Sequence, residues 1–171
     1  GDGKKMCAYL FEGYWKDVGT IKSLWEANMD LLGDNPAFDL YDRSWRIFYR
    51  HSAEPPQKLY AGSVVENSMV TEGCRIHGTV KGSVLSEGVI VEDGAIVINS
   101  VIMRGAHICS GAVVEYSIVD QNSVIGEGAH IGADNGSDGI TVIAEELNIK
   151  PNAVIERGEM IDDANAGDYI N

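Results

Sequence analysis

The feature that most constrains the fold of this chain is an aliphatic residue that returns about every six positions beyond residue 60. Each step between Val91 and Ile131 is either five or six positions long. A helix would repeat apolar residues about every 3.6 positions, and a meander would place turn signals about every 8–12 residues. The series therefore predicts a triangular coil of roughly 17–18 residues per turn. Its inward-facing residues would be Val65, Val70, Ile76, Val80, Leu85, Val91, Val97, Ile102, Ile108, Val114, Val119, Ile125 and Ile131.

Smaller residues support the same coil. Small or β-branched residues, such as Cys74, Ala95 and Ala112, stand four positions after many of the aliphatics, as a narrow interior requires. Acid–glycine pairs such as Asp93-Gly94 predict corners, where glycine relieves backbone strain. Four serines mark equivalent places at spacings of 15, 17 and 17: Ser68, Ser83, Ser100 and Ser117. A β-sandwich with irregular strands is the alternative, and the long six-residue register disfavours it.

The register is interrupted once. Residues 134–139 are polar and rich in glycine, which predicts an excursion loop. The register resumes with Ile149, Ala153, Ile155, Glu159 and Ile161, so we expect one or two further coils. The pattern resembles the hexapeptide repeat of left-handed parallel β-helix proteins. The left hand is implied by that resemblance alone, because the general preference for right-handed crossovers would predict the opposite.

Charge divides the chain into two regions. The 171 residues hold 26 acidic and 13 basic side chains, a net charge of −13, and residues 61–171 alone hold 17 acids against five cations. This balance excludes non-specific nucleic-acid binding and an anionic membrane surface as partners. The acids most simply coat the outer faces of the coil. No apolar run approaches the roughly 20 residues of a membrane-spanning helix, and three cysteines without metal or CxxC spacing predict a reduced, cytoplasmic protein.

The part of the chain before the repeat is built differently. Residues 7–18 predict a strand or a strand–turn–strand, and Thr20 is a candidate N-cap for a helix over residues 21–32. Residues 44–49 predict a short strand, and Pro55-Pro56 marks the seam. These elements are too few for a core of their own. We expect residues 1–60 to be the tail of a larger domain with its linker, and residues 61–171 to be the β-helix.

The segment FEGYWKDVGTIKSLWEANMDLL (residues 11–32) carries a specific resemblance. It resembles the end of the catalytic domain of bacterial glucose-1-phosphate adenylyltransferases. In that family the segment is followed by a Trp-containing strand, a Pro-Pro linker and a left-handed β-helix. Here Trp45, Pro55-Pro56 and the repeat appear in that order. The resemblance implies an enzyme of glycogen biosynthesis that makes ADP-glucose and pyrophosphate from ATP and glucose 1-phosphate.

The resemblance also implies site residues. The implied reaction joins two anions, the sugar phosphate and ATP, and therefore needs Mg²⁺, which carboxylates hold. In the wider family the Asp of the motif Trp-x-Asp-x-Gly-Thr is one of these metal ligands. Asp17 is the candidate ligand here, and Trp15 would pack beside it. Spacing alone favours a different role for Asp17, a favourable interaction with the dipole at the start of the following helix, and the resemblance reverses that preference. The family's other catalytic groups should lie upstream, so we expect this segment to be inactive alone.

Regulation and alternative functions stay open at this stage. In the family the β-helix builds a homo- or hetero-tetramer, and sugar-phosphate or nucleotide effectors bind near the domain junction, where Arg46 and Arg50 are candidates. A non-catalytic regulatory subunit is the first alternative. A hexapeptide-repeat acyltransferase, using His77, His107 or His130 as a base, is the second. The separations between these histidines are not multiples of the coil length, so the three should not form one metal site.

Overall fold

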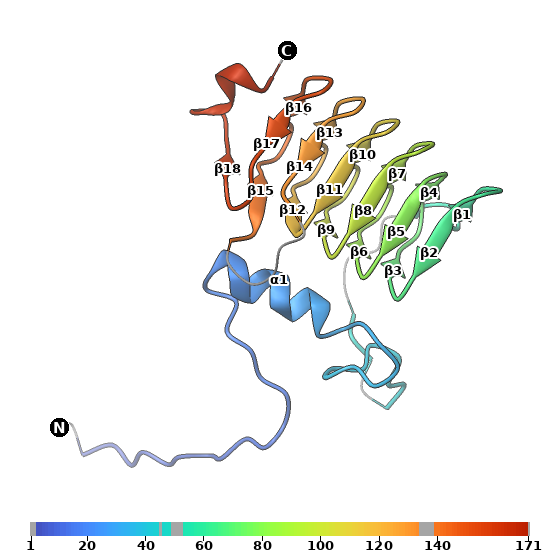
Figure 1. The fold of residues 1–171 in the computed structure, drawn as a ribbon. Coiled ribbons are helices and arrows are strands. Elements are labelled where there is room, and N and C mark those ends of the chain that lie inside the picture. Colours follow the sequence, from blue (N-terminus) through green and yellow to red (C-terminus); the bar gives the residue numbers. More distant parts are fainter. Residues whose placement is uncertain (1–2, 45, 49–52, 134–138, 171) are drawn as a thin grey trace.

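The computed structural model describes residues 3–44, 46–48, 53–133 and 139–170. Its main body is a solenoid with three parallel six-stranded sheets, one on each face of a triangle (Figure 1). Sheet 1 contains β1 (Lys58–Leu59), β4 (Arg75–Ile76), β7 (Ile90–Val91), β10 (His107–Ile108), β13 (Val124–Ile125) and β16 (Asn148–Ile149). Sheet 2 contains β2 (Val64–Glu66), β5 (Thr79–Lys81), β8 (Ile96–Ile98), β11 (Val113–Glu115), β14 (His130–Ile131) and β17 (Val154–Ile155). Sheet 3 contains β3 (Met69–Val70), β6 (Val84–Leu85), β9 (Val101–Ile102), β12 (Ser117–Val119), β15 (Thr141–Ile143) and β18 (Met160–Ile161).

The strand register confirms the predicted parallel coil, and the solenoid matches a left-handed β-helix of the hexapeptide-repeat type. Arg75 pairs with Ile90, and Ile90 pairs in turn with His107, so the register advances by 15 and then 17 residues, as the serine spacings predicted. The coil that contains the predicted loop is longer, since Val124 pairs with Asn148. The 134–138 segment of that loop lies outside the described residues. Core residues return earlier than expected after it, because Ile143 and Leu147 are already buried.

The predicted inward residues form the core. From Ile76 to Ile131 every aliphatic in the series is fully buried, and so are the small residues four positions after them. Val65 and Val70 are only partly buried, because fewer coils lie on their side of the solenoid. At the other end the 3₁₀ turn η1 (Ala166–Asp168) and the following Tyr169 and Ile170 pack against the last coils. The core is therefore a single column that stacks identical positions of successive coils.

The repeated serines form a hydrogen-bonded ladder inside one corner. Ser83, Ser100 and Ser117 are fully buried. The backbone N–H of Ser100 donates to the Ser83 hydroxyl and that of Ser117 donates to the Ser100 hydroxyl, each at 3.1 Å. Each hydroxyl in turn donates to a carbonyl two residues earlier in its own coil. Serine recurs there because its hydroxyl supplies the backbone at the corner with partners that the sheets do not provide.

Glycine recurs at the corners for a conformational reason. The glycines of the predicted acid–glycine pairs, including Gly94 and Gly128, all have φ near +70°. Gly132 has φ +74°, and a Cβ added there would overlap the carbonyl oxygen of Glu115 in the preceding coil. Both the left-handed backbone and the close approach of two coils thus require glycine at position 132.

A single α-helix among the described residues packs against the outside of the solenoid. Helix α1 (Ile21–Met29) has Thr20 as its N-cap, as predicted, and Thr20 also forms a capping box with Ser23. It ends at Met29, earlier than the expected residue 32, because Asp30 already serves as its C-cap. The Trp25 indole donates to the Asn99 carbonyl at 2.8 Å and stacks on Tyr116 with ring centroids 5.8 Å apart.

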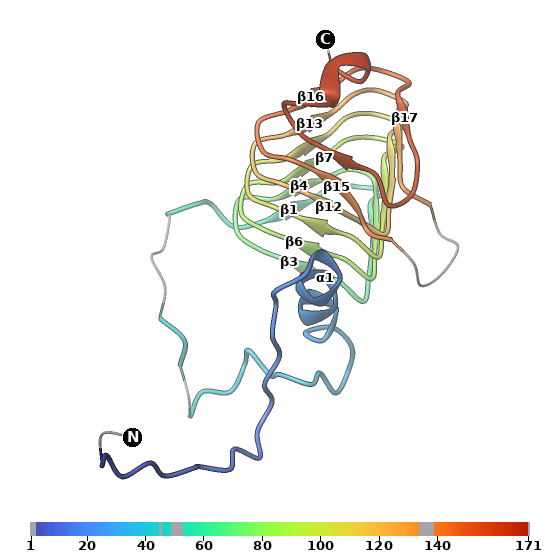
Figure 2. The same cartoon turned by 90° about the vertical axis from the view of Figure 1, so that its left-hand side faces the viewer.

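The helix covers the face made by sheet 3 (Figures 1 and 2). On this sheet Leu85 and Ile102 point into the core, so their neighbours Val84 and Val101 point outward. These outward residues are nevertheless buried, at 9% and 3% exposure. The helix thereby ties the N-terminal region to the β-helix.

The predicted strand at residues 7–18 is wrong. None of the described residues 3–19 forms a strand, although the segment is rich in strand-forming side chains. A strand needs a neighbour to complete its hydrogen bonds, and the described part of this chain provides none. The strand expected at 44–49 is also absent over its described residues, 44 and 46–48, while Trp45 and Tyr49 lie outside the described residues. Within the described residues, no helix is long and apolar enough to cross a membrane.

Candidate functional site

The motif from Trp15 to Thr20 lies in the extended segment that leads into α1. Trp15 is 76% exposed, and Asp17 is also exposed. Asp17 Oδ1 accepts the Gly19 N–H at 3.1 Å, which forms a tight turn just before the helix. The N-cap role belongs to Thr20, so Asp17 does not cap the helix. The second carboxylate oxygen, Oδ2, has no protein partner among the described residues, and a carboxylate oxygen suits a hard divalent cation.

Lys16 connects this motif to the helix, a role that the sequence did not reveal. Its ammonium lies 2.7 Å from Asp30 Oδ2 and 3.4 Å from Glu26 Oε2. The Tyr14 hydroxyl also donates to Asp30, at 3.0 Å. The hydrogen bond from Lys16, with a smaller one from Tyr14, lowers the pKa of Asp30. The side chains on either side of Trp15 are thus fixed to α1, and Trp15 and Asp17 are left facing solvent.

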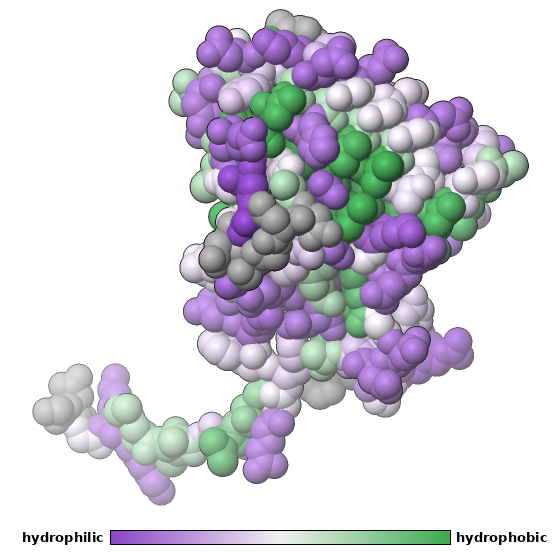
Figure 3. Space-filling view, viewed as in Figure 1, coloured by the Kyte–Doolittle hydropathy of each residue, from purple (hydrophilic) through white to green (hydrophobic). Residues whose placement is uncertain are grey.

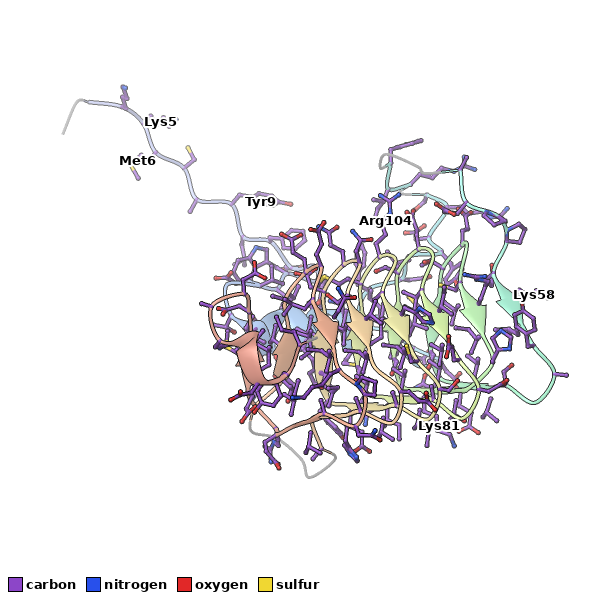
Figure 4. All side chains as sticks on the ribbon, turned by 90° about the horizontal axis from the view of Figure 1, so that it is seen from above. Lys5, Met6, Tyr9, Lys58, Lys81 and Arg104 are labelled. Carbon is purple, nitrogen blue, oxygen red and sulfur yellow. The ribbon has the colours of Figure 1, made fainter. Side chains whose placement is uncertain are left out.

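Of the two arginines predicted to bind an effector, only one lies in the part of the chain that the structure describes. Arg46 is exposed, and Arg50 lies outside the described residues. A cleft of about 650 Å³ opens between the Leu40–Tyr41 turn and the first coils, and Arg104 lines it. Figure 4 shows Arg104 beside the linker, with Lys58 at the end of the solenoid. Arg104 Nε lies 3.7 Å from Glu87 Oε2, so a carboxylate already shares this cleft with it.

The three histidines of the coils are separate from one another, as their spacing predicted. Each lies near a different carboxylate, and none is fully buried. His107 Nε2 is 2.7 Å from Glu92 Oε1, whereas His130 Nε2 is 3.5 Å from Glu115 Oε2. Because the three rings do not converge, the structure assembles no three-histidine metal site within the described residues.

One histidine nevertheless belongs to a cluster that the sequence analysis missed. Potential ligand atoms of Glu92, His107 and Cys109 all lie within 4.8 Å of one another. Ser110 donates its backbone N–H and its hydroxyl to Glu92 Oε2, both at 2.9 Å. The hydrogen bonds from Ser110 and then from His107 lower the pKa of Glu92. Burial, followed by the charges of Glu92 and Glu127, raises the pKa of the Cys109 thiol.

The spacing between successive coils could have revealed this cluster from the sequence. Local motif spacing, such as CxxC, gave no reason to associate Cys109 with a ligand partner. Glu92 and Cys109 occupy equivalent positions in successive coils, and each directly follows a strand of sheet 1. In a solenoid such residues become neighbours, so ligand pairs should be sought at the coil period.

Comparison with known proteins finds two family models that match different parts of the chain. The family model described as "GlmU-like, C-terminal hexapeptide" matches residues 55–143, and the model described as "Nucleotidyl transferase" matches residues 1–34. Among solved structures, the acetyltransferase domain of PglB from Neisseria gonorrhoeae is 23% identical and has a TM-score of 0.34. That match covers 64% of this chain and 50% of the other.

Curated relatives confirm the resemblance found in the sequence. Proteins named glucose-1-phosphate adenylyltransferase from Bacillus mycoides, Bacillus cereus and Bacillus anthracis are each 52% identical over 144 residues. These matches cover 84% of this chain but only 38% of each relative, so the chain spans about two fifths of their length. The hexapeptide model covers more than half of the chain, and its coils are those of the solenoid. The chain therefore belongs to the GlmU-like, C-terminal hexapeptide family and resembles the corresponding part of the glucose-1-phosphate adenylyltransferases.

Proposed function

We propose that this chain is part of a glucose-1-phosphate adenylyltransferase, which forms ADP-glucose and pyrophosphate from ATP and glucose 1-phosphate for glycogen biosynthesis. In this proposal residues 1–60 belong to the nucleotidyltransferase domain and its linker, and residues 61–171 form a domain for assembly and regulation. The segment by itself is inactive. One observation carries the proposal: the segment that matches the nucleotidyltransferase model contains α1, and α1 packs against the hexapeptide β-helix through Trp25.

The exposed apolar side chains of the N-terminal segment support this assignment. Met6, Tyr9, Leu10 and Trp15 are between 76% and 93% exposed. Figure 4 shows Met6 and Tyr9 on a segment that extends away from the β-helix, and Figure 3 shows apolar colouring along it. Contiguous exposed apolar surface of this kind marks a place where another protein surface packs. In the proposal, the remainder of the nucleotidyltransferase domain covers it and supplies the missing neighbours of the predicted strand.

Asp17 is the proposed metal-binding residue of this segment. A bound Mg²⁺ would neutralise charge that develops as the sugar phosphate attacks the ATP α-phosphate. Asp17 suits this role because Gly19 orients one carboxylate oxygen and leaves the other free. Lys16, held by Asp30 and Glu26, fixes the backbone on which Asp17 stands. In the proposal, Trp15 packs beside the site where the remainder of the domain covers this segment.

Regulation and assembly are assigned to the seam and the coils. Arg46 and Arg50 are the proposed cations for an anionic sugar-phosphate or nucleotide effector, and Arg104 lines a cleft beside the first coils. Sheet 2 carries outward aliphatic residues, including Ile96, Val113 and Val154, and an apolar patch spreads over this face in Figure 3. An apolar sheet face is suited to association with another subunit. We therefore assign to the β-helix the contacts of a homo- or hetero-tetramer.

A chimera tests the catalytic assignment. This chain would replace the matching 144 residues of the Bacillus cereus relative, and ADP-glucose synthesis would be measured as a function of Mg²⁺ concentration. The Asp17→Asn substitution keeps an acceptor for the Gly19 N–H but removes the charge. We expect it to lower kcat about 100-fold or more, which corresponds to several kcal/mol of transition-state stabilisation. The Mg²⁺ requirement should rise at the same time.

Asp39→Asn is the matched control. Asp39 Oδ1 accepts the N–H of Tyr41, two residues on, as Asp17 does with Gly19. This variant should retain the activity of the parent chimera. An Asp17→Asn chimera with unchanged kcat and Mg²⁺ dependence would refute the metal assignment. Pyrophosphate release by the 171-residue chain alone, above the background without protein, would refute its proposed inactivity.

A further inference from the structure

The cluster of Glu92, His107 and Cys109 lies on sheet 1 and is separate in sequence from the Trp15–Thr20 motif. We propose that these three side chains bind a borderline-soft divalent cation of the zinc class, with a water molecule completing a four-coordinate site. The proposal rests on residues of the solenoid alone and stands independently of the adenylyltransferase assignment. Its donors are an imidazole nitrogen, a thiolate sulfur and a carboxylate oxygen.

The strand register fixes the three ligands on one outer face. His107 lies in β10, and Cys109, two residues after His107, directly follows that strand, so both side chains point to the same side. Glu92 follows β7 in the same way. Strands β7 and β10 are paired, with Val91 opposite Ile108, which places Glu92 opposite Cys109. Two rigid neighbouring coils, rather than a loop, therefore hold the ligand set.

The separations match what a metal ion would require. The three ligand atoms lie within 4.8 Å of one another, and His107 Nε2 is already 2.7 Å from Glu92 Oε1. A tetrahedral zinc ion has bonds of about 2.0–2.3 Å to nitrogen, oxygen and sulfur, so its ligands are spaced by roughly 3–4 Å. Small side-chain rotations bring the present atoms to that spacing without moving the strands.

Ser110 prepares the carboxylate for this role. Its N–H and hydroxyl both bind Glu92 Oε2, which leaves Oε1 directed towards His107. Hydrogen bonds that orient a ligand in this manner raise metal affinity. On binding, the S–H bond of Cys109 breaks, its proton leaves to water, and the thiolate sulfur bonds the metal. The cation takes the place of that proton, and the negative charges of Glu92 and Glu127 attract the cation to the site.

The donor set also selects the metal. Thiolate and imidazole ligands favour zinc and chemically similar ions, whereas magnesium and calcium prefer oxygen ligands alone. Access is open, because Glu92 and Cys109 line a surface depression of about 510 Å³ together with Gly126 and Glu127. A site with three protein ligands and an accessible fourth position can hold a water molecule.

Cobalt(II) titration tests the proposal, because a thiolate bound to cobalt gives a near-ultraviolet charge-transfer band and tetrahedral cobalt absorbs strongly in the visible. The 171-residue chain would carry Cys7→Ser, which removes an exposed thiol. We expect one equivalent of Co²⁺ to give both signals, Zn²⁺ to displace it, and excess Mg²⁺ to leave it bound. Cys109→Ser should abolish the charge-transfer band, and His107→Gln should weaken binding at least about tenfold.

His130→Gln is the matched control. His130 forms a similar pair with Glu115 on sheet 2, but it is not part of the three-ligand cluster. Its variant should bind Co²⁺ as the parent does, and far-ultraviolet circular dichroism should show that all variants are folded. A parent protein without the charge-transfer band would overturn the proposal. So would a band that survives Cys109→Ser, or equal losses of affinity in His107→Gln and His130→Gln.

Discussion

Replacing Ser100 by alanine tests whether the serine ladder stabilises the solenoid. Ser100 lies in the middle of the ladder and is fully buried. Its hydroxyl accepts the Ser117 N–H at 3.1 Å and donates to the Ile98 carbonyl at 2.7 Å. Alanine removes both bonds but keeps the backbone conformation, so the change in stability reports on the hydroxyl group.

The expected magnitude follows from which groups lose their partner. The Ile98 carbonyl still accepts the N–H of Tyr116 at 3.1 Å. The Ser117 N–H has no second acceptor among the described residues, and Ser117 is fully buried, so water cannot replace the hydroxyl. One buried donor left unsatisfied costs about 1–3 kcal/mol. We therefore expect Ser100→Ala to lower the free energy of unfolding by that amount.

Urea unfolding followed by circular dichroism measures this change. Ser68→Ala is the control, because Ser68 occupies the same ladder position but is only partly buried, in the first of the four serine-bearing coils. Its hydroxyl accepts the N–H of Ser83, which is itself fully buried, but Ser68 is partly open to solvent. Ser68→Ala should therefore cost less, because a water molecule can take the place of the lost hydroxyl. The slope of the free energy against urea should be equal in the two variants, which shows that the same surface unfolds. Equal stability of Ser100→Ala and the parent, within about 0.5 kcal/mol, would refute the proposed role of the ladder.

Two further results are expected. Gly132→Ala should destabilise the folded protein more than Gly111→Ala does. Both glycines have positive φ, a conformation that costs alanine about 1–2 kcal/mol, but only at Gly132 would the added Cβ overlap a backbone carbonyl oxygen. Equal melting temperatures for the two variants would contradict this argument. The lowered pKa of Glu92 means that its stabilising contribution is present above its ordinary pKa of 4.5 and is lost as the pH falls through the lowered value. Melts in acid should therefore show a smaller loss of stability for Glu92→Gln than for the parent, and identical pH profiles would exclude this contribution.

The coil was predictable because its signal is local and repeated. Each of the aliphatics from Ile76 to Ile131 points inward as the six-residue spacing required, and the corner glycines have the left-handed backbone that their position predicted. Helix α1 was also predictable, since Thr20 and Ser23 specify its start without reference to the rest of the chain. The strand at 7–18 failed because strand formation depends on a neighbour, and side-chain propensity cannot supply one.

The sequence by itself determined the period, the interior and the corners of this protein, because a solenoid repeats one short-range pattern and each coil contacts only its neighbours. It also made Asp17 the candidate metal ligand, through a motif whose residues are adjacent in the chain. Only the tertiary structure decided which outer side chains meet. Winding brings Glu92 beside His107 and Cys109, and it places Trp25 against Asn99 and Tyr116. These contacts join residues from different coils or from the helix and the coils, so they depend on the exact register and on how α1 docks.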